Sequence, residues 1–431
     1  MKRKFINIIT LIVTICFVNS GWAYNSINLE KIRGEADKQA NSFTVENQDH
    51  STVAMNISGE IFSTWNSHGN RDNSGSAVCA RTITEGLSAI SDEFILNQTT
   101  IGNQLVPDVA AASTDLFCAT YSSDAKAGYD VFVTCYSIDD QTVKIEEIKL
   151  NTTPSTKMIW PDIAMNDHYF IVVWDHVDGN RLNYYASVYS LSGEEIIGEK
   201  KINRLQYDEP YIYSSGLPDI DVNATGEGFI TWENFNSEGV TIVGCPFTLN
   251  ANKKTIEQEE LISQPTSSAI IDQRRPMVDI NGHGDVVISW AEGENGDSNS
   301  AVYFMKYDNS LKSWGPKVCP HEDAIENDLA QHRSIAKLTD TGEVVIAWTS
   351  DTYHSEDDIF MRFYDNNNES ISDVIQINNT VAGNQCRPAI DWLKKNNTNS
   401  NIWRMIVSWD GQDDDMSGVF LQVYNVEFCN E

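Results

Sequence analysis

Basic residues are scarce in this chain of 431 residues, which has 30 lysines and arginines against 62 aspartates and glutamates and a formal net charge of −32. An acidic surface repels the phosphates of nucleic acids and of anionic lipids. The composition therefore argues against nucleic acid as a partner. It favours a protein that stays in solution, and its many carboxylates are oxygen ligands of the kind that Ca²⁺ accepts.

Long apolar runs are absent from all but the N-terminal end, and no other stretch approaches the roughly 20 apolar residues of a membrane-spanning helix. The one such run, residues 5–18, follows three basic residues at positions 2–4 and precedes Gly21-Trp22-Ala23. This order is typical of a secretory signal peptide. We therefore expect a signal peptide at 1–23, a mature chain without a membrane span, and a secreted or periplasmic protein.

Several catalytic signatures are also missing. The sequence contains no G-x-S-x-G elbow, no H-E-x-x-H pair and no phosphate-cradling glycine loop, and its eight histidines are scattered over predicted turns and loops. No C-x-x-C pair occurs, so a structural zinc site is not indicated. Acid pairs for glycoside cleavage are compatible with so acidic a chain, but the distance between two carboxyls does not follow from sequence. The motifs by themselves therefore indicate no catalytic residue and no metal ligand.

What the chain does have is a repeat. Residues 276–290 show its unit, in which two short apolar runs flank a glycine-containing turn and a tryptophan closes the second run. The seven closing residues are Trp65, Tyr121, Trp174, Trp232, Trp290, Trp348 and Trp409. They follow one another at intervals of 53 to 61 residues. A period in this range, made of strands, is typical of propeller blades.

The repeat predicts an all-β fold, a seven-bladed β-propeller of four-stranded antiparallel blades, as a single domain over residues 24–431. In the fifth repeat, residues 276–280, 286–290, 301–308 and 314–319 read as the four strands, from innermost to outermost. One such sheet is apolar on both faces, so it is stable only where neighbouring blades cover both. The closing aromatic rings are then expected to fill the wedge between blades rather than to stack on a ligand.

The two ends of the chain are predicted to meet. Residues 41–48 carry Asn and Gln at the same spacing as residues 97–104 and 378–385, which connect an outer strand to the next inner strand. The residues just before Asn41 should therefore form an outer strand that completes the last blade and removes an exposed sheet edge. Residues 24–33 show no strand period and are expected to be a lead-in.

The cysteines suit this arrangement only in part. The mature chain would keep seven of the eight, so at least one thiol stays free or pairs between molecules. Cys118 and Cys135 fall on adjacent predicted strands of the second blade and are the first candidate pair. The sequence also contains glycosylation acceptor patterns such as Asn151-Thr152-Thr153, whose use depends on the host.

The blade pattern also predicts which rim binds a ligand. The second-to-third and blade-to-blade connections are expected to run to about ten residues and to share one rim. On this long-loop face, five glutamines stand three positions before an inner strand, namely Gln48, Gln104, Gln273, Gln331 and Gln385. Because they recur in most blades, we interpret them as structural and expect them to hydrogen-bond the crossover backbone.

Two further sets break the symmetry of the ring. Arginines precede the inner strands of blades five to seven, and aspartates open those of blades two to four. The candidate ligand-binding residues are Arg275, Arg333, Arg387, Asp108, Asp162 and Asp219. Three arginines on one arc could hold a carboxylate, which guanidinium groups bind bidentately. Alternatively, the arginines and aspartates pair across the channel mouth, or with loop acids.

The tips of the hairpin loops collect acids, namely Asp72, Asp124, Asp178, Asp297, Asp357, Asp358 and Asp413-Asp414-Asp415. Carboxylates beside Gly and Asn could hold Ca²⁺, but the same residue types also form turns. None of the tips matches the D-x-[DN]-x-[DN]-G calcium loop in full. No cofactor is therefore predicted, with Ca²⁺ as the one candidate.

Residues 103–110, Asn-Gln-Leu-Val-Pro-Asp-Val-Ala, precede a turn and a strand that ends on an aromatic residue, and this pattern resembles the tandem propeller repeat of secreted or surface-attached bacterial proteins. The resemblance covers nearly the whole mature chain and implies a scaffold whose members bind varied partners. Sialidases are also propellers and use three arginines for a sugar carboxylate. This chain lacks their S-x-D-x-G-x-T-W box, has seven repeats instead of six, and shows no assignable Tyr/Glu nucleophile pair.

Together these patterns predict an exported, non-enzymatic recognition protein that binds a glycan or an extracellular protein on its long-loop face. The alternative is a glycosidase or lyase, sialidase-like, that acts on an acidic sugar. The fold alone does not choose between them.

Overall fold

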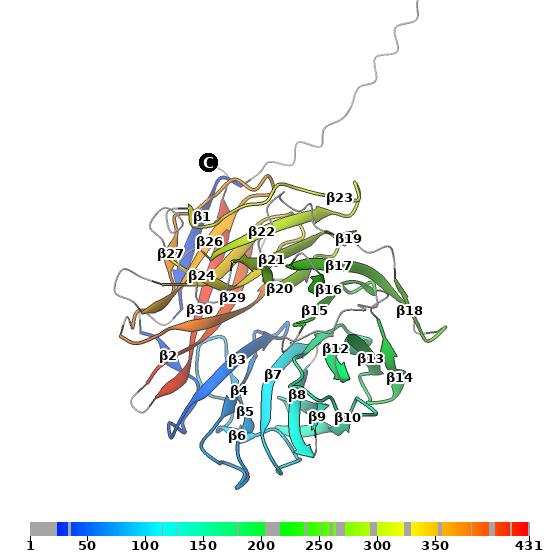
Figure 1. Cartoon of the computed structure of the whole chain (residues 1–431). Coiled ribbons are helices and arrows are strands. Elements are labelled where there is room, and N and C mark those ends of the chain that lie inside the picture. The colour runs from blue at the N-terminus through cyan, green and yellow to red at the C-terminus, as the bar shows by residue number, and fades with distance from the viewer. Residues whose placement is uncertain are drawn as a thin grey trace, which may run out of the picture.

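The computed structural model describes residues 24–32, 36–113, 115–126, 128–178, 181–202, 216–236, 239–250, 252–258, 262–263, 272–293, 300–322, 329–351, 356–380, 382–395, 401–413 and 416–429. The proposed signal peptide at 1–23 lies outside this part of the chain. Within it, the strands form seven antiparallel sheets that follow one another around a central axis (Figure 1). The predicted seven-bladed β-propeller is therefore confirmed.

The first four blades follow the chain directly. Blade 1 contains β3 (Gln48–Met55), β4 (Ile61–Ser67), β5 (Ala77–Ile83) and β6 (Phe94–Ile95). Blade 2 contains β7 (Gln104–Ala111), β8 (Leu116–Lys126), β9 (Gly128–Ser137) and β10 (Thr142–Lys149). Blade 3 contains β11 (Pro161–Met165), β12 (Tyr169–Asp178), β13 (Arg181–Ser190) and β14 (Glu195–Lys201). Blade 4 contains β15 (Asp219–Val222), β16 (Glu227–Asn236), β17 (Gly239–Asn250), β18 (Thr255–Gln258) and β19 (Ile262–Ser263).

Three more blades complete the ring. Blade 5 contains β20 (Gln273–Ile280), β21 (Val286–Glu292), β22 (Ala301–Asp308) and β23 (Ser313–Trp314). Blade 6 contains β24 (Gln331–Leu338), β25 (Val344–Asp351), β26 (Asp357–Tyr364) and β27 (Ile375–Gln376). Blade 7 contains β28 (Cys386–Lys394), β29 (Ile402–Gln412) and β30 (Ser417–Cys429), with the N-terminal strands β1 (Ser26–Lys31) and β2 (Lys38–Gln39) paired to β30.

The core lies between the blades rather than inside any one of them. Seven apolar clusters are found among the described residues, and each draws its side chains from two neighbouring blades. The closing aromatic residues belong to these layers, since Trp65, Tyr121 and Trp290 are fully buried and Trp232 is 2% exposed. The expected structural role of these rings is therefore confirmed.

Ring closure follows the predicted scheme, with one correction. The whole of β1 pairs antiparallel with β30, from Ser26 opposite Cys429 to Lys31 opposite Tyr424. The expectation that residues 24–33 form no strand was therefore wrong. This strand lies at the outer edge of its sheet and its apolar pattern is weak, so only pairing with the far end of the chain makes it a strand.

The repeated glutamines hydrogen-bond the crossover backbone as predicted, and the repeated asparagines also bind backbone groups. Asn41 Oδ1 accepts the N–H of Val419 at 2.8 Å and so joins the chain ends. The glutamines contact crossover carbonyls, as Gln104 Nε2 does with Ile101 O at 3.1 Å. Gln331 Nε2 does the same with His321 O at 2.8 Å.

The predicted disulfide is also present. Cys118 and Cys135 stand opposite each other on β8 and β9 and form a disulfide bond. Among the described cysteines, Cys79, Cys319, Cys386 and Cys429 are free.

The second-to-third connections are shorter than expected in most blades. In blade 6, β25 ends at Asp351 and β26 begins at Asp357, and in blade 7, β29 ends at Gln412 and β30 begins at Ser417. The difference is largest in blades 2 to 4. The strands of the second-to-third hairpins in blades 2 to 4 continue outward, so β8 ends at Lys126 and β9 begins at Gly128. The corresponding breaks fall between Asp178 and Arg181 in blade 3 and between Asn236 and Gly239 in blade 4. The prediction of connections about ten residues long was therefore wrong for these hairpins, because polar side chains also suit an exposed two-stranded ribbon. No helix in the described part of the chain is long and apolar enough to cross a membrane.

Candidate functional site

A strained backbone position recurs at the start of the innermost strands. In five blades the residue at this position is not glycine and yet has a positive φ angle. The angle is 54° at His50, 49° at Val106, 54° at Arg275, 54° at Arg333 and 57° at Arg387. The strand pairing shifts register at each of these points, as in a β-bulge. Such conformations are costly and re-aim the side chain.

Counting Leu217 (φ 41°) and Trp160 at the matching positions of blades 4 and 3, one residue per blade forms a set that we call the bulge ring. Its members are His50, Val106, Trp160, Leu217, Arg275, Arg333 and Arg387.

A neighbouring side chain holds several of the bulges in place. At four of them, the residue after the closing aromatic of the preceding blade accepts the backbone N–H of the bulge residue. Glu233 Oε1 accepts Arg275 N at 2.8 Å, and Asn66 Oδ1 accepts Val106 N at 2.8 Å. Asp410 Oδ2 does the same for His50 N at 2.9 Å across the junction of blades 7 and 1. This contact satisfies a buried donor and stabilises the strained backbone.

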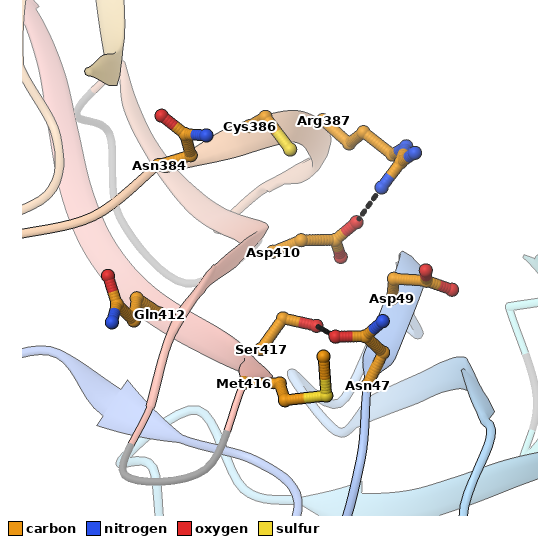
Figure 2. A pocket seen from close by; sticks show the side chains of 9 residues that line it. All are labelled: Asn47, Asp49, Asn384, Cys386, Arg387, Asp410, Gln412, Met416 and Ser417. Atoms are coloured by element: carbon orange, nitrogen blue, oxygen red, sulfur yellow. Dashed lines mark hydrogen bonds and ion pairs between the residues drawn. The ribbon is translucent and has the colours of Figure 1, made fainter. Parts of the chain in front are cut away.

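The three predicted arginines do come together. Burial and the positive charges of Arg333 and Arg387 lower the pKa of Arg275 to about 10. Burial and Arg387 likewise lower the pKa of Arg333. Arg387 is the exception, because its Nη1 lies 2.9 Å from Asp410 Oδ2 and this carboxylate raises its pKa against the effect of burial (Figure 2). One arc of the bulge ring is therefore strongly positive.

The three predicted aspartates bind backbone groups. Each lies two positions beyond its bulge and accepts a backbone N–H of the next blade. Asp108 Oδ2 accepts Ile163 N at 3.1 Å, Asp162 Oδ2 accepts Ile220 N at 2.7 Å, and Asp219 Oδ2 accepts Val278 N. Burial raises the pKa of all three, and Asp108 also hydrogen-bonds to Asp162.

These aspartates therefore join blade to blade. Within the described part of the chain, no ion pair connects them to the three arginines. The alternative prediction of pairing across the mouth is thus not what the structure contains. The acid that pairs with Arg387 is Asp410, which lies on strand β29 and not in a loop.

In blades 1 to 4, which carry no arginine in the bulge ring, the ring is aromatic and apolar. His50 belongs to blade 1 and Trp160 to blade 3, yet the centroids of their rings lie 5.5 Å apart. Sequence reasoning missed both residues. The available signal for Trp160 was its position directly before a proline, which it shares with Arg275 and Arg387. His50 precedes a serine, as Arg333 does.

A hydrogen-bonded network adjoins this aromatic side. Asp49 Oδ1 contacts His50 Nδ1 at 3.0 Å, His68 Nε2 at 3.1 Å and Asn66 Nδ2 at 3.0 Å. Although burial opposes it, bonding to the two histidines holds the pKa of Asp49 far below its usual range. The same contact raises the pKa of His68. An ionised carboxylate and a proton-binding imidazole therefore face the site.

A polar pocket of about 280 Å³ lies at the seam between blades 7 and 1. Its lining combines Asn47, Asp49, Asn384, Cys386, Arg387, Asp410, Gln412, Met416 and Ser417 (Figure 2). Arg387 thus belongs to both the positive arc and the pocket. Amide, hydroxyl and carboxylate groups supply both donors and acceptors for a hydroxyl-rich ligand.

The described hairpin-tip acids accept hydrogen bonds either within their own turn or from a neighbouring blade-to-blade connection. Asp72 Oδ1 accepts Ser74 N at 3.1 Å, Asp124 Oδ2 accepts Asn103 Nδ2 at 2.8 Å, and Asp358 Oδ1 accepts Asn378 Nδ2 at 2.6 Å. Asp413 Oδ1 accepts Met416 N at 3.0 Å. The side chains of Asp178, Asp297, Asp414 and Asp415 fall outside the described part of the structure.

Comparison with known proteins gives the fold only. No family model matches the chain, and no curated protein matches it in sequence. Among solved structures, a protein of unknown function from Dyadobacter fermentans DSM 18053 is 10% identical with a TM-score of 0.55, over 93% of this chain and 99% of that one. The polysaccharide lyase Uly1 is 9% identical with a TM-score of 0.52, over 93% and 94% of the two chains.

An ulvan lyase, described as polysaccharide lyase PL25, is 10% identical with a TM-score of 0.50, over 91% of this chain and 95% of that one. Identities this low show a shared fold and nothing finer. The chain is thus similar in fold to propellers that include glycan-active enzymes.

Proposed function

We propose that this protein is an exported recognition protein that binds an acidic glycan at the bulge ring, without cleaving it. The observation that carries the proposal is the convergence of Arg275, Arg333 and Arg387 on one arc. Among the described residues, Arg275 and Arg333 have no carboxylate within ion-pair distance, although neighbouring charges lower the pKa of both. A bound anion would remove this repulsion, and guanidinium groups hold carboxylates or sulfates through paired hydrogen bonds.

The rest of the site suits a sugar. Trp160 and His50 offer ring faces in the part of the bulge ring that has no arginine, and such faces pack against the apolar side of a pyranose. The polar pocket next to Arg387 has room for a further part of the ligand. Two of the proteins similar in fold are named polysaccharide lyases, which is consistent with a glycan ligand. Export rests on the signal-like pattern of residues 1–23.

A lyase or glycosidase acting on an acidic sugar is the second candidate. It is favoured by one observation, the network of Asp49, His50 and His68 beside Arg387. A carboxylate-oriented histidine next to an arginine could exchange a proton with a sugar whose carboxylate the arginine holds.

A glycan array that includes uronate, sialate and sulfated sugars tests both candidates. We expect wild-type protein to bind acidic glycans, and Arg275→Ala/Arg333→Ala/Arg387→Ala to bind at least about tenfold more weakly, since one charge-assisted hydrogen bond is worth about 1.5–3 kcal/mol. The matched control is Lys144→Ala/Lys201→Ala/Lys253→Ala, which removes three positive charges from exposed strand and turn positions.

Time-dependent release of product would establish the second candidate instead of the first. Equal glycan binding by wild type and the arginine variant would overturn the site. If wild-type protein binds no glycan but captures an acidic extracellular protein through the same arginines, the ligand class is wrong and the site is right.

A further inference from the structure

Three metal-ligating side chains meet on the rim of blade 6, on strands adjacent to the bulge ring. His332 lies on β24, Asp351 ends β25 and Asp357 begins β26. Strand pairing places Asp351 directly opposite Asp357, and Gln331, next to His332, opposite Ser350. One nitrogen or oxygen atom from each of the three residues lies within 4.8 Å of the others. All three side chains are partly accessible at the rim.

At the same three positions of blade 1, the side chains satisfy one another's hydrogen bonds. There Asp49, His68 and Ser76 take the places of His332, Asp351 and Asp357. Asp49 Oδ1 lies 3.1 Å from His68 Nε2, and His68 Nδ1 lies 2.9 Å from Ser76 Oγ. One carboxylate, one imidazole and one hydroxyl satisfy one another in a hydrogen-bonded chain.

In blade 6, the charges and hydrogen bonds of the three side chains are not matched in this way. Asp351 and Asp357 stand directly opposite each other on neighbouring strands, where like charges repel. His332 Nε2 lies 3.6 Å from Asp357 Oδ1, beyond hydrogen-bond distance. Arg333 is near enough to offset part of the charge of Asp357, but two carboxylates and one imidazole still share the cluster.

We infer that His332, Asp351 and Asp357 form a binding site for a divalent transition-metal ion. Ligands about 2.0–2.2 Å from an ion such as Zn²⁺ stand roughly 3–4 Å from one another, and the 3.6 Å between His332 and Asp357 falls in that range. The ion would also remove the repulsion between the two carboxylates. This inference does not depend on the proposed glycan binding.

The ligand set selects among metals. An imidazole nitrogen beside carboxylates suits Zn²⁺, Mn²⁺ or Co²⁺, whereas Ca²⁺ and Mg²⁺ prefer oxygen ligands throughout. Three protein ligands leave a coordination position open for water or a ligand oxygen. Because Arg333 follows His332 directly in the chain, that position lies beside the positive arc of the bulge ring.

The test uses chelator-treated full-length protein and metal salts alone. We expect Co²⁺ to produce a saturable visible absorption band, and Zn²⁺ to compete for the site and raise the melting temperature. His332→Gln and Asp351→Asn/Asp357→Asn should weaken metal affinity at least about tenfold. The control, His68→Gln, alters the equivalent set of blade 1 and should bind metal as wild type does.

The melting temperature of each variant without metal shows whether a loss of metal binding comes from a folding defect. The double Asn variant should be as stable as wild type or more so, because it removes the like-charge contact while its metal response is lost. No saturable band, or an undiminished band in His332→Gln, would overturn the site. Tighter binding of Ca²⁺ than of Zn²⁺ would overturn the role of the histidine. The triple arginine variant should keep metal binding, which separates this result from the fate of the proposed function.

Discussion

Single polar residues decide how neighbouring strands are joined in this protein. Asn151 looks like a glycosylation acceptor in the sequence, yet it is 2% exposed. Its Nδ2 donates to Thr153 O at 2.8 Å and to Asp130 Oδ1 at 3.1 Å, and its Oδ1 accepts Val131 N at 2.9 Å. The Asn-x-Thr pattern therefore reflects a structural contact that holds the connection after blade 2 against strand β9.

We predict that Asn151→Ala destabilises the protein by about 1–3 kcal/mol, because the buried N–H of Val131 loses its acceptor. Urea unfolding followed by tryptophan fluorescence measures the change. Asn252→Ala, in an exposed turn, is the control and should stay within about 0.5 kcal/mol of wild type. Glycan found on Asn151 of folded protein made in a glycosylating host would contradict this buried contact.

Among the strands, β1 shows how an element can depend on a distant partner. Ile27 and Leu29 pack against the apolar cluster between blades 6 and 7, while Asn28 and Glu30 face outward. Among the described residues, the strand pairs only with β30, at the other end of the chain.

We predict that Ile27→Ala/Leu29→Ala costs about 2 kcal/mol or more of unfolding free energy, the lower end for aliphatic truncation because both side chains are only partly buried. Asn28→Ala/Glu30→Ala changes the opposite face of the same strand and should cost less than about 1 kcal/mol. Chemical denaturation of both variants provides the comparison. Equal losses would mean that β1 contributes hydrogen bonds but no packing.

On the scale of the whole molecule, buried acids make stability depend on pH. Burial raises the pKa of Asp175 to about 7, although its carboxylate accepts Trp160 N and Gly216 N, and it raises the pKa of Asp221 to about 7 as well. A raised pKa means that the folded protein binds protons that the unfolded chain has already released. The large negative charge acts in the same direction, because protonation lowers repulsion within the folded molecule.

We therefore predict that the protein is most stable near pH 4–5 and loses stability as pH rises to about 7, by up to about 1.4 kcal/mol per pH unit for Asp175. Urea midpoints at several pH values in this window measure the slope. Asp175→Asn removes the titrating group and keeps an acceptor oxygen, so its profile should be flatter. A wild-type profile that rises with pH would contradict the assignment.

The number of blades, the buried aromatic layer, the glutamine contacts and the Cys118–Cys135 bond all followed from the sequence. Each depends on residues within one repeat or on the identity between repeats. The extended hairpins of blades 2 to 4 could not be predicted, because the same polar residues suit a loop or an exposed ribbon. The structural use of Asp108, Asp162 and Asp219 also escaped prediction, since their acceptor role depends on the backbone of the next blade.

The periodic pattern of apolar and turn residues by itself determined that this chain forms seven sheets and that its ends meet in one of them, because strand period and blade packing are local properties repeated along the chain. Only the tertiary structure decided which side chains of different blades come together. Trp160 and His50 approach each other, three arginines share one arc, and His332 joins two aspartates. Strand register and ring closure set these meetings, and they bring together residues that no sequence spacing relates.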